Sequence, residues 1–251
     1  IYQCDWSSDV CSSDLIAKVD WNIAEGHRAS LTYRRNYGQN TVFANYNGNT
    51  TTSLSNYWYD QPRNTDSYTA QLNSQWTSDL RTEVTLSDTK YDGSPANHGA
   101  AFPQVQVQGL TGRRLDTGAT ITNGAIFFGT ESSRQLNAIT TKEKQAKISA
   151  EYSRGDHTFV AGFEDIATKY TNAFVQFTDG YYTFSSLANW QAGTPVSAYQ
   201  LSVPFAGFAI NDAVARWSYD AYAFFLQDNW KPTRDLTILG GLRFDTPHVP
   251  E

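Results

Sequence analysis

Apolar and polar residues alternate along several stretches of this chain. The first stretch covers residues 16–24, where every second residue from Ala17 to Ile23 is apolar and the residues between them are polar. A period of two residues indicates a β-strand with one apolar and one polar face. Similar stretches recur in pairs, and a short polar turn separates the two members of each pair. The four turns cover residues 24–27, 77–80, 154–157 and 231–235.

These hairpins alternate with three long loops rich in Asn, Thr, Gly and aromatic residues. Strands of about ten residues can cross a bilayer when tilted. Short turns on one side and long loops on the other are typical of an outer-membrane barrel. The sequence therefore predicts an all-β fold, an antiparallel transmembrane β-barrel fragment of about eight strands in four hairpins, with short periplasmic turns and long extracellular loops. The hairpins are expected at about 16–36, 65–92, 141–171 and 216–246, and the loops at about 37–64, 93–140 and 172–215.

Aromatic residues stand near the turns, where one membrane interface is expected. Amphipathic rings prefer this boundary, because one edge is polar and the body is apolar. The expected membrane-interface girdle consists of Trp21, Trp76, Tyr152 and Trp230. A second belt is expected at the opposite strand ends, formed by Tyr33, Tyr68, Tyr91, Tyr170, Trp217 and Tyr219. Two belts favour lipid contact over burial of the strands in a soluble core.

The composition narrows the class of protein. The chain has 251 residues and a formal net charge of -6, and its mean hydropathy is -0.50. In a barrel only alternate strand residues face lipid, so a polar mean is compatible with a membrane protein. No apolar run of about 18 residues occurs, so no transmembrane helix is expected. No basic patch is present, so no nucleic-acid partner is expected.

The start of the chain differs in character from the rest. The chain contains no Met and no signal peptide, so it is expected to be a central piece of a longer barrel. Residues 1–15 resemble a translated sequencing-adapter tail and contain both cysteines, Cys4 and Cys11. The alternatives are a small disulfide loop or a metal site, which two cysteines without a nearby His match poorly. Residues 16–247 are expected to form the barrel part, and 248–251 to begin the next external loop.

No motif indicates enzymatic chemistry. The four histidines share no spacing with one another or with carboxylates, as a metal site would require. No phosphate-binding loop, dinucleotide fingerprint or nucleophile elbow occurs, and no spacing of Ser, His and Asp selects a triad. The sequence therefore predicts a protein that is not an enzyme and has no cofactor, metal or catalytic residue.

Aromatic residues of the expected external loops are the candidates for ligand binding. Their rings stack on sugars and provide a large contact area at low entropic cost. The alternative is that the rings pack the loops onto one another or onto the outer leaflet, and the sequence favours neither. The candidates are Trp58, Tyr59, Tyr181, Tyr182 and Trp190.

The fourth hairpin resembles the barrel signature of TonB-dependent receptors. In that family an aromatic–x–Gln-Asp–x–Trp-Lys strand turns into a Leu-x-Leu-x-x-Gly-Leu-Arg-Tyr/Phe-Asp strand, and residues 222–232 and 236–245 follow this form. Residues 155–162 resemble a further hairpin of the family. Residues 180–188, followed by 193–195, resemble a loop of the Oar-like subgroup, which usually carries an N-terminal carboxypeptidase-regulatory-like domain.

The resemblance implies a gated import channel of the cell outer membrane. A plug domain, missing from these residues, would close the barrel and be rearranged by the TonB complex. The implied partners are outer-membrane lipid, the TonB complex through the plug region, and a small ligand such as a siderophore, an oligosaccharide or a peptide. Two alternatives stay open: a plugless barrel acting as an adhesin or structural anchor, and a soluble secreted β-sandwich that binds carbohydrate.

Overall fold

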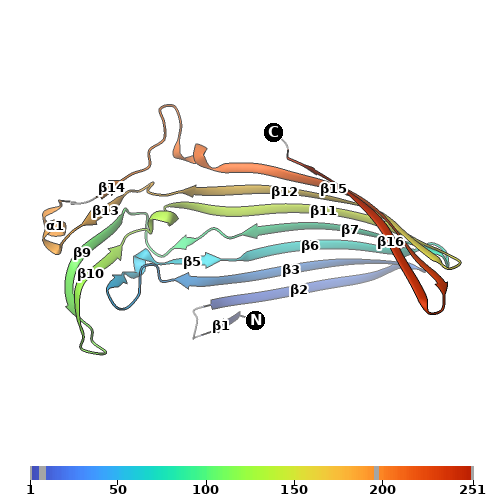
Figure 1. The fold of residues 1–251 in the computed structure, drawn as a ribbon, viewed down its shortest axis with the longest axis horizontal. Coiled ribbons are helices and arrows are strands. Elements are labelled where there is room, and N and C mark those ends of the chain that lie inside the picture. Colours follow the sequence, from blue (N-terminus) through green and yellow to red (C-terminus); the bar gives the residue numbers. More distant parts are fainter. Residues whose placement is uncertain (1, 6–9, 195–197, 250–251) are drawn as a thin grey trace.

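The computed structural model describes residues 2–5, 10–194 and 198–249, and its main feature is one long antiparallel sheet. Eight long strands of this 11-stranded sheet lie side by side in chain order and run from the short turns at one end to the loops at the other (Figure 1). This arrangement confirms the predicted fold class. The strands are β2 (Val10–Ala24), β3 (His27–Val42), β6 (Asn64–Gln75), β7 (Leu80–Asp92), β11 (Leu136–Arg154), β12 (His157–Val175), β15 (Ala215–Thr233) and β16 (Leu236–His248).

All four short turns lie where the sequence places them, between β2 and β3, β6 and β7, β11 and β12, and β15 and β16. Gly26 and Gly155 occupy two of these turns with φ values of 75° and 60°. Glycine adopts this left-handed conformation without steric cost. A Cβ atom on Gly26 would also lie 2.8 Å from the carbonyl oxygen of Gln75 on the neighbouring strand. The turn at residue 26 therefore requires glycine.

The strands are longer than a membrane crossing needs, at up to 19 residues in β11, β12 and β15. Residues beyond the crossing continue the same ladder into the loop end. β2 starts at Val10 and pairs with β3 from there on. Ahead of it, the short strand β1 (Tyr2–Asp5) pairs with the beginning of β2.

One face of the sheet is apolar and uncovered. The register places apolar residues of all eight strands in one cross-strand row. Trp21, Phe224 and Phe244 in this row are 65%, 57% and 70% exposed. Such a face is expected of strands that contact lipid. The row consists of Trp21, Ala29, Leu72, Val84, Ile148, Phe163, Phe224 and Phe244.

The opposite face is polar and lies on the inner side of the curved sheet. The row one residue along from the apolar row contains Arg28, Asn73 and Glu83 on consecutive strands. The register also decides which of residues 221–227 face outward, although both alternating sets of these residues are apolar. Phe224 faces outward and Phe225 faces inward. We call these two surfaces the outer face and the inner face.

The second aromatic belt differs from the prediction. Tyr33 and Tyr68 lie on the outer face, where their rings stack with centroids 4.9 Å apart. The other four members are offset by one residue, which turns a side chain to the opposite face of a strand. They lie on the inner face and are Tyr91, Tyr170, Trp217 and Tyr219.

The three long loops build a second, five-stranded sheet at their end of the molecule, in the order β14-β13-β9-β10-β4. Its core is Val105, Val107 and Phe184. We call this sheet and its short helix the loop layer. Its elements are β4 (Thr51–Ser53), β9 (Gln104–Arg113), β10 (Thr120–Phe128), β13 (Tyr181–Phe184), α1 (Leu187–Ala192) and β14 (Ala198–Gln200).

The smaller remaining elements complete the loops. They are η1 (Ser55–Tyr57), β5 (Tyr59–Pro62), β8 (Ala96–Asn97), η2 (Ser132–Arg134) and η3 (Ile210–Ala213). Among the described helices none has the length and apolarity to span a bilayer.

The long sheet does not close on itself. Within the described residues β16 pairs only with β15, and β2 pairs along most of its length only with β3. Unpaired backbone groups on such edges are not tolerated in lipid. The structure is therefore a sector of a barrel wall, with two edges that fit further strands.

Candidate functional site

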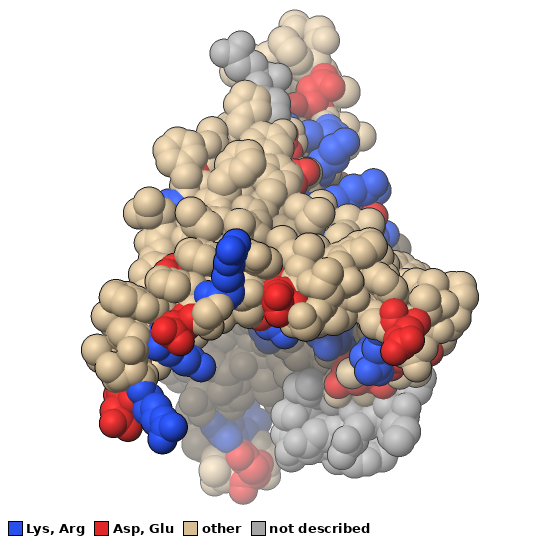
Figure 2. All heavy atoms as spheres, turned by 90° about the vertical axis from the view of Figure 1, so that its right-hand side faces the viewer, with Lys and Arg blue, Asp and Glu red and all other residues tan. Residues whose placement is uncertain are grey.

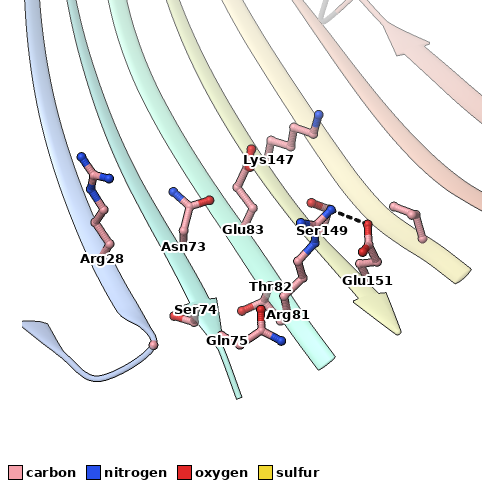
Figure 3. A pocket seen from close by; sticks show the side chains of 12 residues that line it. Arg28, Asn73, Ser74, Gln75, Arg81, Thr82, Glu83, Lys147, Ser149 and Glu151 are labelled. Carbon is pink, nitrogen blue, oxygen red and sulfur yellow. Dashed lines mark hydrogen bonds and ion pairs between the residues drawn. The ribbon is translucent and has the colours of Figure 1, made fainter. Parts of the chain in front are cut away.

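The inner face carries a polar groove near the short turns. It has a volume of about 500 Å³ and is formed by β3, β6, β7, β11 and β12 (Figure 3). Figure 2, viewed from the short-turn end, shows cationic and anionic side chains close together around a hollow beneath the sheet. The charged and amide side chains that line the groove are Arg28, Asn73, Arg81, Glu83, Lys147 and Glu151.

Most charges on the inner face are paired. Arg81 and Glu151 form an ion pair of 2.6 Å between β7 and β11. Glu164 accepts two cations, with Lys147 at 3.5 Å and Arg243 at 2.8 Å. These pairs join neighbouring strands and keep the side chains extended along the wall.

Glu83 is the exception among the groove's carboxylates. Within the described residues it has no ion-pair partner and accepts only a long hydrogen bond, 3.4 Å, from the Thr85 hydroxyl. Its strand neighbours in the row are Asn73 and Ser149, which are both uncharged. An unpaired carboxylate in a polar groove is suited to a cationic group from a partner.

A glycine shapes the wall beside the groove. Gly162 of β12 lies opposite Phe225 of β15, and the Phe225 ring occupies the space that a Cβ of residue 162 would need. The Lys147 ammonium lies 5.8 Å from the centre of the same ring. Phe225 therefore covers Gly162 and packs beside Lys147 on the inner face.

Two of the predicted ligand-binding residues lie at one edge of the loop layer. Trp58 packs edge-on against Phe43 with ring centroids 4.7 Å apart, and its Nε1 donates to the Ser53 hydroxyl. Tyr59 is 9% exposed, with the Arg134 guanidinium 4.7 Å from its ring centre. These contacts are those expected of rings that pack loops together.

The other three candidates lie on β13 and α1, towards the opposite edge of the five-stranded sheet. The Tyr181 hydroxyl donates to Gln106, and the Tyr182 ring packs against Tyr199. Trp190 contacts two core rings edge-on and is 38% exposed. Trp58 and Tyr59 therefore lie where the long sheet meets β4, and the other three candidates lie on the far side of the five-stranded sheet. Ligand binding by the five residues stays a prediction.

Two polar features of the loop layer are firmly held. Arg114 donates to Asp116 and lowers the pKa of that carboxyl well below its usual range; it also contacts Asn49. Burial raises the pKa of the Tyr57 phenol far above its usual value, and the negative charge of Glu131 adds to this effect. Asp116 is exposed, whereas Tyr57 is buried beside Phe127 of the loop layer.

The predicted girdle residues lie on the outer face near the short turns. Trp76 packs against His27 with ring centroids 4.9 Å apart, and Trp230 stacks on His157 at 5.5 Å. Trp21 and Tyr152 lie three and two residues from the ends of their strands. No group of three or more His, Cys, Asp or Glu side chains in the described part of the chain is arranged to hold a metal ion.

The charged groove was not predicted from the sequence. Its residues belong to the polar halves of the strands, so the period of two already placed them on one face. The sequence does not show the register between strands, and it is this register that brings Arg81 of β7 opposite Glu151 of β11.

Comparisons with known proteins agree with this architecture. The family described as outer membrane beta barrel domain matches residues 7–251, which is nearly the whole chain. This chain belongs to that family. The barrel sector is therefore an outer-membrane structure, and lipid is the surrounding medium of its outer face. A comparison with curated proteins found no match.

Solved structures show the same fold for this outer-membrane chain. The Escherichia coli outer membrane transporter YddB superposes with a TM-score of 0.62 at 11% identity, over 95% of this chain and 27% of that one. P. aeruginosa FpvA, bound to pyoverdines, superposes with a TM-score of 0.56 at 11% identity, over 96% of this chain and 31% of that one. The copper transporter OprC superposes with a TM-score of 0.54 at 13% identity, over 95% of this chain and 29% of that one. This chain thus spans about a third of each transporter or less.

Proposed function

We propose that this barrel sector belongs to a TonB-dependent outer-membrane receptor of the Oar-like kind, which binds a scarce ligand and imports it through a plugged barrel. The hairpin of residues 222–245 supports the proposal through its resemblance to that receptor family. The likeness to outer membrane transporters supports it at the level of fold. Transport by such a receptor is physical gating, so no covalent step is assigned to this chain.

The observation that carries the proposal is the groove of the inner face. Glu83 forms no ion pair among the described residues although three cations line the same groove. Its carboxylate is therefore available to a cationic group of a domain inside the barrel. We propose that Glu83 pairs with a cationic side chain of a plug domain, and that the neighbouring ion pairs provide a flat polar surface for it. The loop layer would then capture the ligand above the plug.

The test uses the full-length gene product in outer membranes. A photo-crosslinking amino acid is placed at Glu83 and, in a matched control, at Val84, which is the next residue along the strand and lies on the outer face. We expect position 83 to form a crosslink to another part of the same chain, seen as a band of altered mobility and located by mass spectrometry. Position 84 should give no protein crosslink.

The competing function is a plugless barrel that anchors the loop layer as an adhesive or structural surface. The ordered sheet of the loop layer favours a binding surface in either case. If position 83 gives no protein crosslink while the protein is folded in the membrane, the plugged receptor is excluded and the anchored barrel takes its place.

A further inference from the structure

We propose that the outer face binds phosphate groups of anionic membrane lipids at the loop end, through a row of three lysines. Lys90 of β7 lies directly opposite Lys142 of β11, and Lys142 directly opposite Lys169 of β12. We call these residues the lysine row. The inference depends on the outer-membrane fold and not on ligand uptake.

All three lysines belong to the outer face. Each is an even number of residues from an apolar residue of that face: Lys90 from Leu86, Lys142 from Ile148 and Lys169 from Phe163. The pairing of these strands has no register shift that would change the face. All three side chains are exposed.

Like charges directly opposite one another on adjacent strands are destabilising. None of the three ammonium groups has a carboxylate within ion-pair distance among the described residues. A counter-anion from outside the protein would remove this repulsion, and a phosphate bears enough charge and oxygen atoms to contact more than one ammonium group.

Nearby acidic groups do not neutralise the row. Asp66 lies directly opposite Lys90 on β6, but the Arg35 guanidinium at 4.0 Å and the Tyr33 hydroxyl at 2.8 Å engage its carboxylate instead. Asp88 is paired with Lys144 at 4.0 Å. Asp220, two residues beyond the partner of Lys169 on β15, makes no ion pair in the described structure. Asp92, two residues from Lys90 on the same face, accepts a hydrogen bond from the Ser94 backbone N–H. None of these carboxylates is within ion-pair distance of the three ammonium groups among the described residues.

The row lies at the height of a lipid headgroup. Tyr152, in the girdle at the short-turn end, is ten residues from Lys142 on the same strand. That spacing is about 33 Å along a strand, or about 25 Å across a membrane at the usual tilt of about 40°, which equals the height of a barrel's apolar band. Lys142 therefore lies at the level of lipid phosphates, and the outer-face pair of Asp88 and Lys144 lies one step nearer the membrane centre.

The experiment compares three variants of the full-length protein purified in non-ionic detergent. The first replaces the row with glutamine (Lys90→Gln, Lys142→Gln and Lys169→Gln). The second keeps the charge by replacing the same residues with arginine. The third, called the inner-side variant, removes equal charge away from the outer face: Lys18→Gln and Arg34→Gln on the inner face, and Lys231→Gln beside a short turn. Native mass spectrometry measures the binding of added phosphatidylglycerol and of phosphatidylcholine.

The wild type and the arginine variant should prefer phosphatidylglycerol. The glutamine row variant should bind it on the order of a hundredfold more weakly, since each lysine near a membrane contributes about 1 kcal/mol. The inner-side variant should bind as the wild type does. Inorganic phosphate at millimolar concentration should not displace the lipid.

Three results would overturn the proposal. The first is equal lipid binding by the wild type and the glutamine row variant. The second is an equal loss in the inner-side variant, which would show a general charge effect. The third is complete displacement by inorganic phosphate, which would show a site for free phosphate. If the glutamine row variant does not fold, the salt dependence of lipid binding by the wild type decides: binding that does not weaken as salt increases contradicts the proposal.

Discussion

At the scale of single residues, the packing of the sheet depends on glycines as well as on residues with large side chains. Gly162 and Gly240 both lie in regular strands, β12 and β16. A Cβ on Gly162 would lie 2.7 Å from the Ile148 carbonyl oxygen and would collide with the Phe225 ring, whereas a Cβ on Gly240 meets nothing within 4 Å. Gly162 lies on the inner face of a central strand, whereas Gly240 lies on the outer face of the edge strand β16.

This contrast predicts different costs for the same substitution. Gly162→Ala should lower the free energy of unfolding by about 1–3 kcal/mol, because the strand pair or the Phe225 ring must shift. Gly240→Ala, the matched control, should be neutral or slightly stabilising. Urea unfolding of the full-length protein in lipid vesicles, followed by tryptophan fluorescence, measures both. Equal effects of the two substitutions would contradict the packing described for Gly162.

At the scale of the elements, each strand presents one residue to lipid and the next to the barrel interior. Leu226 and Gln227 are neighbours on β15, and Leu226 lies on the outer face with 55% exposure. The sequence indicated the hairpins and turns because a period of two and turn residues are local signals. It could not assign residues 221–227 to faces, because both alternating sets are apolar there.

The facing assignment predicts the outcome of a charge scan. Leu226→Arg should destabilise the membrane-inserted state by about 2–4 kcal/mol, because the new charge faces lipid. Gln227→Arg should have little effect, because its side chain faces the polar interior. The amount of folded, protease-resistant protein in outer membranes reports the difference. Comparable losses for both variants would show that the register of β15 is wrong.

The loop layer was less predictable than the strands. The pairing of β9 with β13 and of β10 with β4 is parallel and joins segments from different loops. Such pairing leaves no short-range pattern, because the partners are far apart in the sequence. The prediction of the second aromatic belt was wrong for a different reason. Tyr91, for example, lies at the expected height along its strand, but it is offset by one residue from the outer-face positions and therefore faces inward.

At the scale of the whole molecule, the structure is a curved sector with one face for lipid, one for the barrel interior, and an ordered layer of loops at one end. No described element packs on the outer face, and the match to the outer membrane beta barrel family favours lipid contact over a soluble sandwich. The open edges at β2 and β16 fit a larger barrel. The groove around Glu83 and the lysine row are then two surfaces of the same wall, one for a domain inside and one for lipid outside.

The central claim is that the outer face contacts lipid and the inner face does not. Single cysteines placed in turn at residues 222–227 of the full-length protein, in a background with Cys4 and Cys11 replaced by serine, would carry spin labels in reconstituted vesicles. The account predicts that collision with dissolved oxygen is high at 222, 224 and 226, and that collision with a water-soluble nickel chelate is high at 223, 225 and 227. A profile without this alternation, or with the two sets exchanged, would contradict it.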